Sequence, residues 1–131
     1  MKSKTGIRHL QTVSTMKIER GSILLVGLDP TIGVEIQKTR PCVVVSSDLG
    51  NMYSNMITIL PITSKRLEHV KKIEVFLEKV PGLNVPSKVL ADQVRSIDKR
   101  RVKKVLGKLP RNLLDACDKA LKYHLGYLED L

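Results

Sequence analysis

A chain of 131 residues is long enough for one hydrophobic core and too short for two domains of ordinary size. Hydrophobic residues make up 42% and charged residues 27%, which excludes an intrinsically disordered chain, and no apolar run reaches the length of a transmembrane helix. The formal net charge of +10 favours a polyanion such as a nucleic acid, the alternative being a solvated basic face without a ligand.

Residues 1–15 are polar and basic without periodicity, so we expect a disordered extension, or a segment upstream of the true start, ahead of a domain that spans residues 16–131. They contain three basic residues and no acidic one, which leaves +7 on the domain itself. They also lack the apolar core of a secretory signal. The expected location is therefore the cytoplasm, with no contact to a membrane.

The residue pattern predicts a mainly β fold with a C-terminal helix, an α+β class. Turn residues separate apolar or alternating segments, which predict strands at residues 23–28, 42–47, 56–60, 70–78, 88–97 and 103–109. The run from Cys42 to Val45 predicts a strand buried on both faces, and residues 29–38 predict a mobile loop. Apolar steps of three and four residues after Pro110 predict a helix with Gly126 as its C-cap. Such a set of strands forms a small antiparallel barrel that closes on itself.

The cysteines and histidines do not form a pattern that binds metal. Cys42 and Cys117 lie in apolar patterns, which indicates two buried free thiols rather than a disulfide or a metal pair. His9, His69 and His124 are scattered and have no ligand spacing, so neither a metal site nor a cofactor is expected. A pair of histidines acting as acid and base is equally unsupported.

Arg40 and Thr63 are the strongest candidates for chemistry. Pro41 restricts Arg40 to extended backbone at the edge of a buried strand, and Thr63 follows the next strand. An arginine can donate two charge-assisted hydrogen bonds to a phosphate, and a threonine hydroxyl can add a third donor. Together they predict a phosphate site. Taken singly, Arg40 is equally an ordinary arginine at a strand end, and Thr63 is more typical of a turn or cap.

Several segments are similar, in order and spacing, to the MazF/PemK toxins, which are ribonucleases of bacterial toxin-antitoxin pairs. The resemblance runs from about Met16 to the C-terminus and is carried by RGSILLVGLDP, GVE, KTRP, VVVSSDLGN, LPITS and ADQVRSIDKRR. It implies an SH3-like barrel of the CcdB and MazF type. It also implies that Arg40 and Thr63 are the principal catalytic residues and that Glu35 is the loop carboxylate, proposed as the general base in some members.

The resemblance implies a sequence-specific, metal-independent endoribonuclease that cleaves single-stranded mRNA. Attack by the 2′-hydroxyl would leave a 2′,3′-cyclic phosphate and a 5′-hydroxyl. The implied partners are a second copy of the chain, in a homodimer with RNA between the subunits, and a cognate antitoxin whose acidic segment occupies that groove. Operator DNA would be reached only through the antitoxin complex. Two alternatives stay open: a toxin of the same fold that binds a protein such as gyrase, and an RNA-binding module without catalysis.

Five further residues are candidates for RNA contacts. Ser47, Ser64 and Arg66 are expected to contact phosphates or base edges. Asp92 and Gln93 are expected to read the Watson-Crick edge of an unpaired base, with a buried polar role inside the barrel as the alternative.

The chain departs from the family pattern in two places. Ser22 stands where an acidic residue is common, and Val34 and Ile36 stand where polar residues flank the loop carboxylate. We expect the loss of those polar side chains to change rate or sequence preference.

Overall fold

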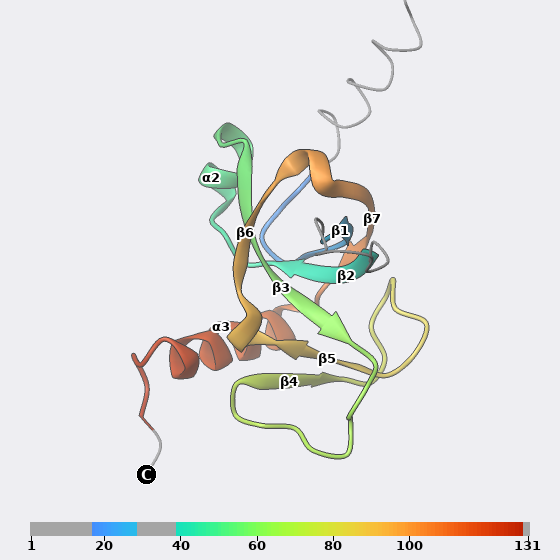
Figure 1. Cartoon of the computed structure of the whole chain (residues 1–131), viewed down its shortest axis with the longest axis vertical. Coiled ribbons are helices and arrows are strands. Elements are labelled where there is room, and N and C mark those ends of the chain that lie inside the picture. The colour runs from blue at the N-terminus through green and yellow to red at the C-terminus, as the bar shows by residue number, and fades with distance from the viewer. Residues whose placement is uncertain (1–16, 29–38, 130–131) are drawn as a thin grey trace, which may run out of the picture.

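The computed structural model describes residues 17–28 and 39–129, so the predicted extension at residues 1–15 and the predicted loop at residues 29–38 lie outside the described residues. The strands, shown in Figure 1, are β1 (Ser22–Gly27), β2 (Thr39–Val44), β3 (Met56–Thr63), β4 (Glu74–Leu77), β5 (Ser87–Leu90), β6 (Arg95–Asp98) and β7 (Val102–Lys108). The helices are α2 (Asp48–Tyr53), α3 (Arg111–His124) and two 3-10 turns, η1 (Ala91–Gln93) and η2 (Lys99–Arg101).

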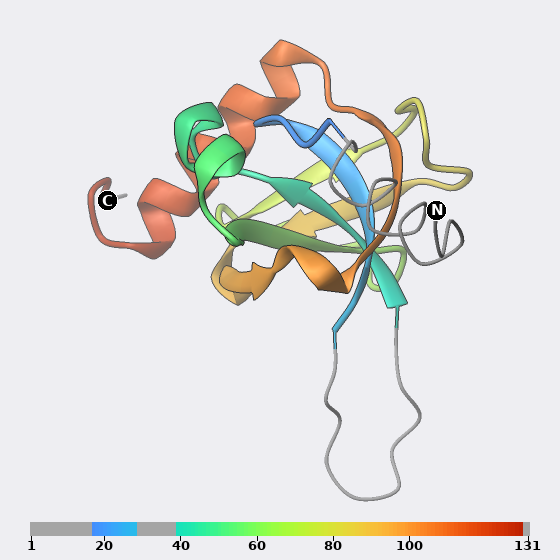
Figure 2. The ribbon, with the colours of Figure 1, turned by 90° about the horizontal axis from the view of Figure 1, so that it is seen from above.

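The sheet is antiparallel, as predicted, and has the hydrogen-bonded order β4-β5-β3-β2-β1-β7. The first half of β3 also pairs with β6, which branches from this order, while its last two residues pair with β5. The prediction that the sheet closes on itself is wrong for the described strands, because the order ends at β4 on one side and β7 on the other. The result is an open, barrel-like sheet, and α3, which follows β7 in the chain, packs beside β4 (Figure 1 and Figure 2).

The segment predicted as one strand at residues 88–97 is two strands. β5 pairs with β4 and with the end of β3, whereas β6 pairs with the beginning of β3, so the chain has to change neighbours between them. The 3-10 turn η1 makes that change. It places Asp92 and Gln93 at the junction of the two strands, where both are exposed.

Helix α2 was not predicted, because its short polar sequence reads as a turn. The Ser47 hydroxyl accepts a hydrogen bond from the Gly50 amide at 3.1 Å and caps the helix. Asn51 is buried and donates to the Ser46 carbonyl at 2.9 Å. The Asp48 carboxylate also accepts a hydrogen bond from the Arg20 amide at 2.7 Å. Local and long-range hydrogen bonds therefore hold six residues in a helix that their intrinsic propensity does not favour.

The core lies on both faces of the central strands. One apolar cluster packs against α3 through Leu114, Cys117 and Ala120, and a second lies on the other face of β1, β2 and β3. Neighbouring residues alternate between the clusters, since Val43 belongs to the first and Val44 to the second, which confirms the prediction of a strand buried on both faces. No helix in the described part of the chain is long and apolar enough to cross a membrane.

Two sequence predictions about single residues are confirmed. Gly126 follows the end of α3 with a φ of +85°, the left-handed conformation of a helix C-terminus. Cys42 and Cys117 are free and buried. Burial raises the pKa of each thiol to about 12, although the charges of Arg95 and Arg40 act in the opposite direction on Cys42. Both cysteines therefore serve packing.

Candidate functional site

The pairing of β2 with β3 brings Arg40 and Thr63 together. The register sets Cys42 opposite Pro61, and continuing it by two residues sets Arg40 opposite Thr63. Residues opposite one another in an antiparallel pair project from the same face of the sheet. Cys42 is fully buried on that face, whereas Arg40 and Thr63 are half-buried. This face of the sheet is therefore part of the core at Cys42 and reaches the protein surface at Arg40 and Thr63.

Two grooves meet at the Arg40–Thr63 pair. The first has a volume of about 560 Å³ and is lined by Leu25, Thr39, Arg40, Pro41, Ile62, Thr63, Ser64, Lys65, Gly82, Leu83, Asn84, Val85, Ser87, Lys104 and Leu106. The second has a volume of about 420 Å³ and is lined by Leu28, Arg40, Pro61, Thr63, Lys65, Arg66, Lys71, Glu74, Lys88, Leu90, Asp92 and Gln93. Arg40, Thr63 and Lys65 line both, so an extended ligand that crosses from one groove to the other passes them.

The grooves are positively charged. Arg40, Lys65 and Lys104 line the first groove, which has no acidic residue among its described lining residues. The second adds Arg66 and Lys71, against the acidic residues Glu74 and Asp92, and its Glu74 is paired with Lys88 at 3.0 Å. A concave surface of this charge attracts polyanions and not cationic or apolar ligands.

The two central side chains are available to a ligand. Within residues 17–28 and 39–129, no ion pair engages the Arg40 guanidinium. The Thr63 hydroxyl oxygen accepts a hydrogen bond from the Lys65 amide at 3.2 Å. This contact fixes the position of the oxygen and leaves its proton free to donate toward the grooves. The pair therefore offers several donors to one anionic group, which is the chemistry of a phosphate site.

The structure brings together most of the predicted site residues. Ser64 lines the first groove, while Arg66, Asp92 and Gln93 line the second. Because Asp92 and Gln93 are exposed, they do not have the buried polar role that was the alternative. Glu35, with its neighbours Val34 and Ile36, lies outside the described residues.

Among the predicted site residues that the structure describes, Ser47 alone lines neither groove. It follows the C-terminal end of β2, whereas Arg40 lies at the other end of that strand, and its hydroxyl is used to cap α2. Its position after a strand, which suggested a ligand contact, reflects the start of an unpredicted helix.

Four lysines of the grooves were not proposed as site residues from the sequence: Lys65, Lys71, Lys88 and Lys104. Lys65 could have been proposed from the sequence, because it stands two residues after Thr63 in a basic segment. Lys88 reaches the site through strand pairing, since β5 sets it opposite Thr63. Lys104 reaches it through the β1–β7 ladder, opposite Leu25. No pattern in the linear sequence indicates either pairing.

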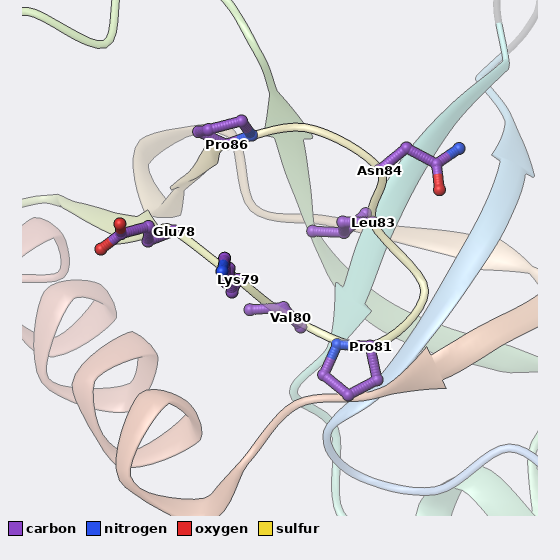
Figure 3. Close-up of a pocket in the computed structure, with 7 residues that line it drawn as sticks. All are labelled: Glu78, Lys79, Val80, Pro81, Leu83, Asn84 and Pro86. Carbon is purple, nitrogen blue, oxygen red and sulfur yellow. The ribbon is translucent and has the colours of Figure 1, made fainter.

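A third cavity, of about 500 Å³, lies on the segment that forms one wall of the first groove. Glu78, Lys79, Val80, Pro81, Leu83, Asn84 and Pro86 line it (Figure 3). Leu83 and Asn84 also line the first groove, and Figure 3 shows both on the part of the segment nearest β1 and β2. None of the predicted site residues lines this cavity, so it is a neighbour of the site and not its centre.

Comparisons with known proteins show the family of the chain and the fold of its relatives. A model of the family described as PemK-like, MazF-like toxin of type II toxin-antitoxin system matches residues 19–125. The chain is 38% identical over 114 residues to Endoribonuclease MazF9 of Mycobacterium tuberculosis, an alignment that covers 82% of this chain and 96% of that protein. Crystal structures of MazF and of the MazE-MazF complex from Deinococcus radiodurans are each 28% identical to it, with TM-scores of 0.68 and 0.70. These two matches cover 82% and 84% of this chain and 96% of each of those chains.

Proposed function

This chain belongs to the PemK-like, MazF-like family of type II toxins, and from that premise we propose that it is an endoribonuclease that cuts single-stranded RNA at a short sequence. The resemblance drawn from the sequence motifs is confirmed by the family match over residues 19–125. The observation that carries the proposal is that Arg40 and Thr63 line both cationic grooves, at the place where the two grooves meet. A single strand that follows both grooves places a phosphate at this pair.

The proposed reaction uses the RNA's own 2′-hydroxyl as the nucleophile and needs no metal ion. The 2′-oxygen loses its proton and bonds to the adjacent phosphorus, the bond from phosphorus to the 5′-oxygen breaks, and the 5′-oxygen gains a proton. Arg40 donates to the phosphorane oxygens, whose negative charge grows in the transition state, and the Thr63 hydroxyl adds a further donor. Glu35 is proposed as the base that takes the 2′-proton. The products are a 2′,3′-cyclic phosphate and a 5′-hydroxyl.

The lining residues have proposed roles along the RNA strand. Ser64, Arg66 and Lys65 contact phosphates on either side of the cut. Asp92 and Gln93 are exposed at the second groove, and their acceptors and donors suit the Watson-Crick edge of an unpaired base. Ser47 has no proposed contact with RNA, because it lines neither groove.

We propose a cognate antitoxin as the regulating partner. A MazE-MazF complex is among the similar solved structures, and an acidic antitoxin segment in the grooves would neutralise the lysines and arginines that otherwise meet RNA. RNA and antitoxin would then compete for one surface, in the cytoplasm. In this proposal operator DNA is contacted only by the antitoxin complex.

A homodimer is proposed through an exposed apolar patch formed by Leu49, Met52, Tyr53 and Met56. Their exposed fractions are 71%, 68%, 77% and 45%, and the first three share one face of α2 at i, i+3 and i+4 spacing. An apolar patch of this kind on a small protein marks a surface that a partner covers. The proposed occupant is the same patch on a second copy of the chain.

We expect sedimentation to give the mass of two chains for the wild type and of one chain for Met52→Glu, because a buried carboxylate in the patch is costly. The control is Tyr127→Glu, which changes an equally exposed apolar residue elsewhere, with 78% exposure, and should stay dimeric. A dimeric Met52→Glu variant would contradict the assignment of the interface, and a monomeric wild type would contradict the dimer.

The function is tested with a long unstructured RNA and with DNA of the same sequence. We expect discrete fragments from the RNA and none from the DNA, because only the ribose carries the nucleophile. Intact RNA that is nevertheless bound would favour a binding module without catalysis. RNA that is neither cut nor bound would favour a toxin that acts on a protein.

A further inference from the structure

Lys88 is a buried cation that is fully used inside the protein. Its exposed fraction is 5%, in strand β5. Its ammonium donates to the Arg66 carbonyl at 2.8 Å, to the His69 carbonyl at 3.0 Å and to Glu74 Oε1 at 3.0 Å. Three acceptors match the three N–H groups of a lysine, so none is left for a ligand. Burying an ion pair is costly unless such contacts satisfy it completely.

The first of these contacts ends at a strained residue. Arg66 has a φ of +57°, and it is the one residue other than glycine with a positive φ among residues 17–28 and 39–129. The left-handed region is unfavourable for a residue with a side chain, so the surrounding structure must hold Arg66 there. The Lys88 ammonium donates directly to the carbonyl oxygen of this residue.

The segment held in this way connects β3 to β4 and forms part of the second groove. It carries Lys65 and Arg66, which line that groove, and it begins directly after Thr63. Lys88 is itself opposite Thr63 in the β3–β5 ladder. The lysine thus fixes the segment to the same strand end that presents Thr63, and the carbonyls of Arg66 and His69 are pulled inward while the Arg66 side chain stays exposed.

We infer that Lys88 is a positioning residue for RNA, which holds Arg66 in its left-handed conformation so that the guanidinium reaches a phosphate in the second groove. The inference deepens the proposed function and rests on it. Lys88 acts through Arg66 and touches no RNA, and Glu74 keeps the buried ammonium paired.

The Lys88–Glu74 pair persists at neutral pH. Burial favours a higher pKa for Glu74, but the Lys71 amide and the Lys88 ammonium, both bonded to its carboxylate, hold the pKa below its usual range. A carboxylate with a lowered pKa contributes stability above its unfolded-state pKa and loses it as the pH falls through the folded-state value. The Glu74 carboxylate is therefore ionised at neutral pH, and its contact with the Lys88 ammonium weakens as the pH falls through this lowered pKa.

The test removes both buried charges at once with Lys88→Met/Glu74→Leu, so that neither is left unpaired. We expect its KM for RNA to rise by about tenfold with kcat within about twofold, since a phosphate contact outside the reacting centre contributes to binding. Arg66→Ala should raise KM by the same factor, and adding it to the double variant should raise KM no further. The control Lys108→Met, which removes an exposed lysine paired with Glu19 outside both grooves, should leave KM unchanged.

Two results would overturn the inference: a double variant with the KM of the wild type, or an effect that adds to that of Arg66→Ala. If the double variant does not fold, melting temperatures of single variants decide. Arg66→Gly should melt roughly 4 °C above Arg66→Ala, because glycine adopts a positive φ without strain. Equal melting temperatures of these two variants would contradict the inference. A wild type that neither cuts nor binds RNA would instead refute the proposed function, and the inference with it.

Discussion

Arg40→Ala is expected to lower kcat for RNA cleavage by about 10²–10³-fold, because it removes the donor aimed at the charge that grows in the transition state. Arg40 is half-buried at the edge of the sheet and is engaged in no ion pair in the described part of the chain, so its loss leaves no partner unsatisfied. The melting temperature should stay close to that of the wild type. Single-turnover cleavage of a short RNA with one cut site, together with thermal unfolding, measures both quantities.

The matched control is Arg100→Ala. Arg100 is an exposed arginine that pairs with Asp98 at 3.0 Å and lines neither groove, so we expect less than about a twofold change in rate. Arg40→Lys should fall between the wild type and Arg40→Ala, since a lysine keeps the charge but loses the two-pronged geometry. An Arg40→Ala variant as fast as Arg100→Ala would remove Arg40 from the site.

Gly82→Ala is expected to be the most damaging small substitution in the described chain, with a loss of about 3 kcal/mol of unfolding free energy. Gly82 has a φ of +95°, and a Cβ added there would lie 2.4 Å from the Leu106 carbonyl oxygen. Both the backbone conformation and the close approach of the segment to β7 require glycine. Because this segment carries Leu83 and Asn84 in the wall of the first groove, RNA binding should weaken as well. Chemical denaturation measures the stability.

Gly126→Ala separates these two causes. Gly126 also has a positive φ, +85°, but a Cβ there would meet nothing within 4 Å. Its substitution should cost only the conformational strain, about 1 kcal/mol. A difference of about 2 kcal/mol between the two variants measures the contact with Leu106. Equal losses would show that the segment moves away from β7 without penalty.

The sequence predicted most strands because continuous apolar runs and alternating segments are local signals. Cys42 to Val45 is apolar without interruption, and the structure buries alternate residues of this run in two different clusters. The division of residues 88–97 into β5 and β6 left no such signal, because it follows from which part of β3 each half meets. Helix α2 was missed because its polar sequence is typical of a turn, and because one of its contacts, from the Arg20 amide to the Asp48 carboxylate, forms only on folding.

The order of the family motifs in the sequence predicted the two central residues of the candidate site and not the residues around them. Arg40 and Thr63 were identified separately, and the pairing of β2 with β3 then brings both to the same two grooves. Lys88 was not identified, because its neighbours suggest an ordinary alternating strand and its role depends on three oxygen atoms from two other segments. Ser47 shows the converse, since a polar residue after a strand can begin a helix instead of contacting a ligand.

The most direct test of the proposed cleavage is to map the fragment ends made by wild-type protein and by Arg40→Ala from a long unstructured RNA in EDTA. The account predicts discrete cuts with a 5′-hydroxyl on one fragment and a 2′,3′-cyclic phosphate on the other, and their loss in Arg40→Ala. Fragments with 5′-phosphates, or cleavage that stops in EDTA and returns with a divalent cation, would contradict attack by the 2′-hydroxyl at a metal-free Arg40–Thr63 site.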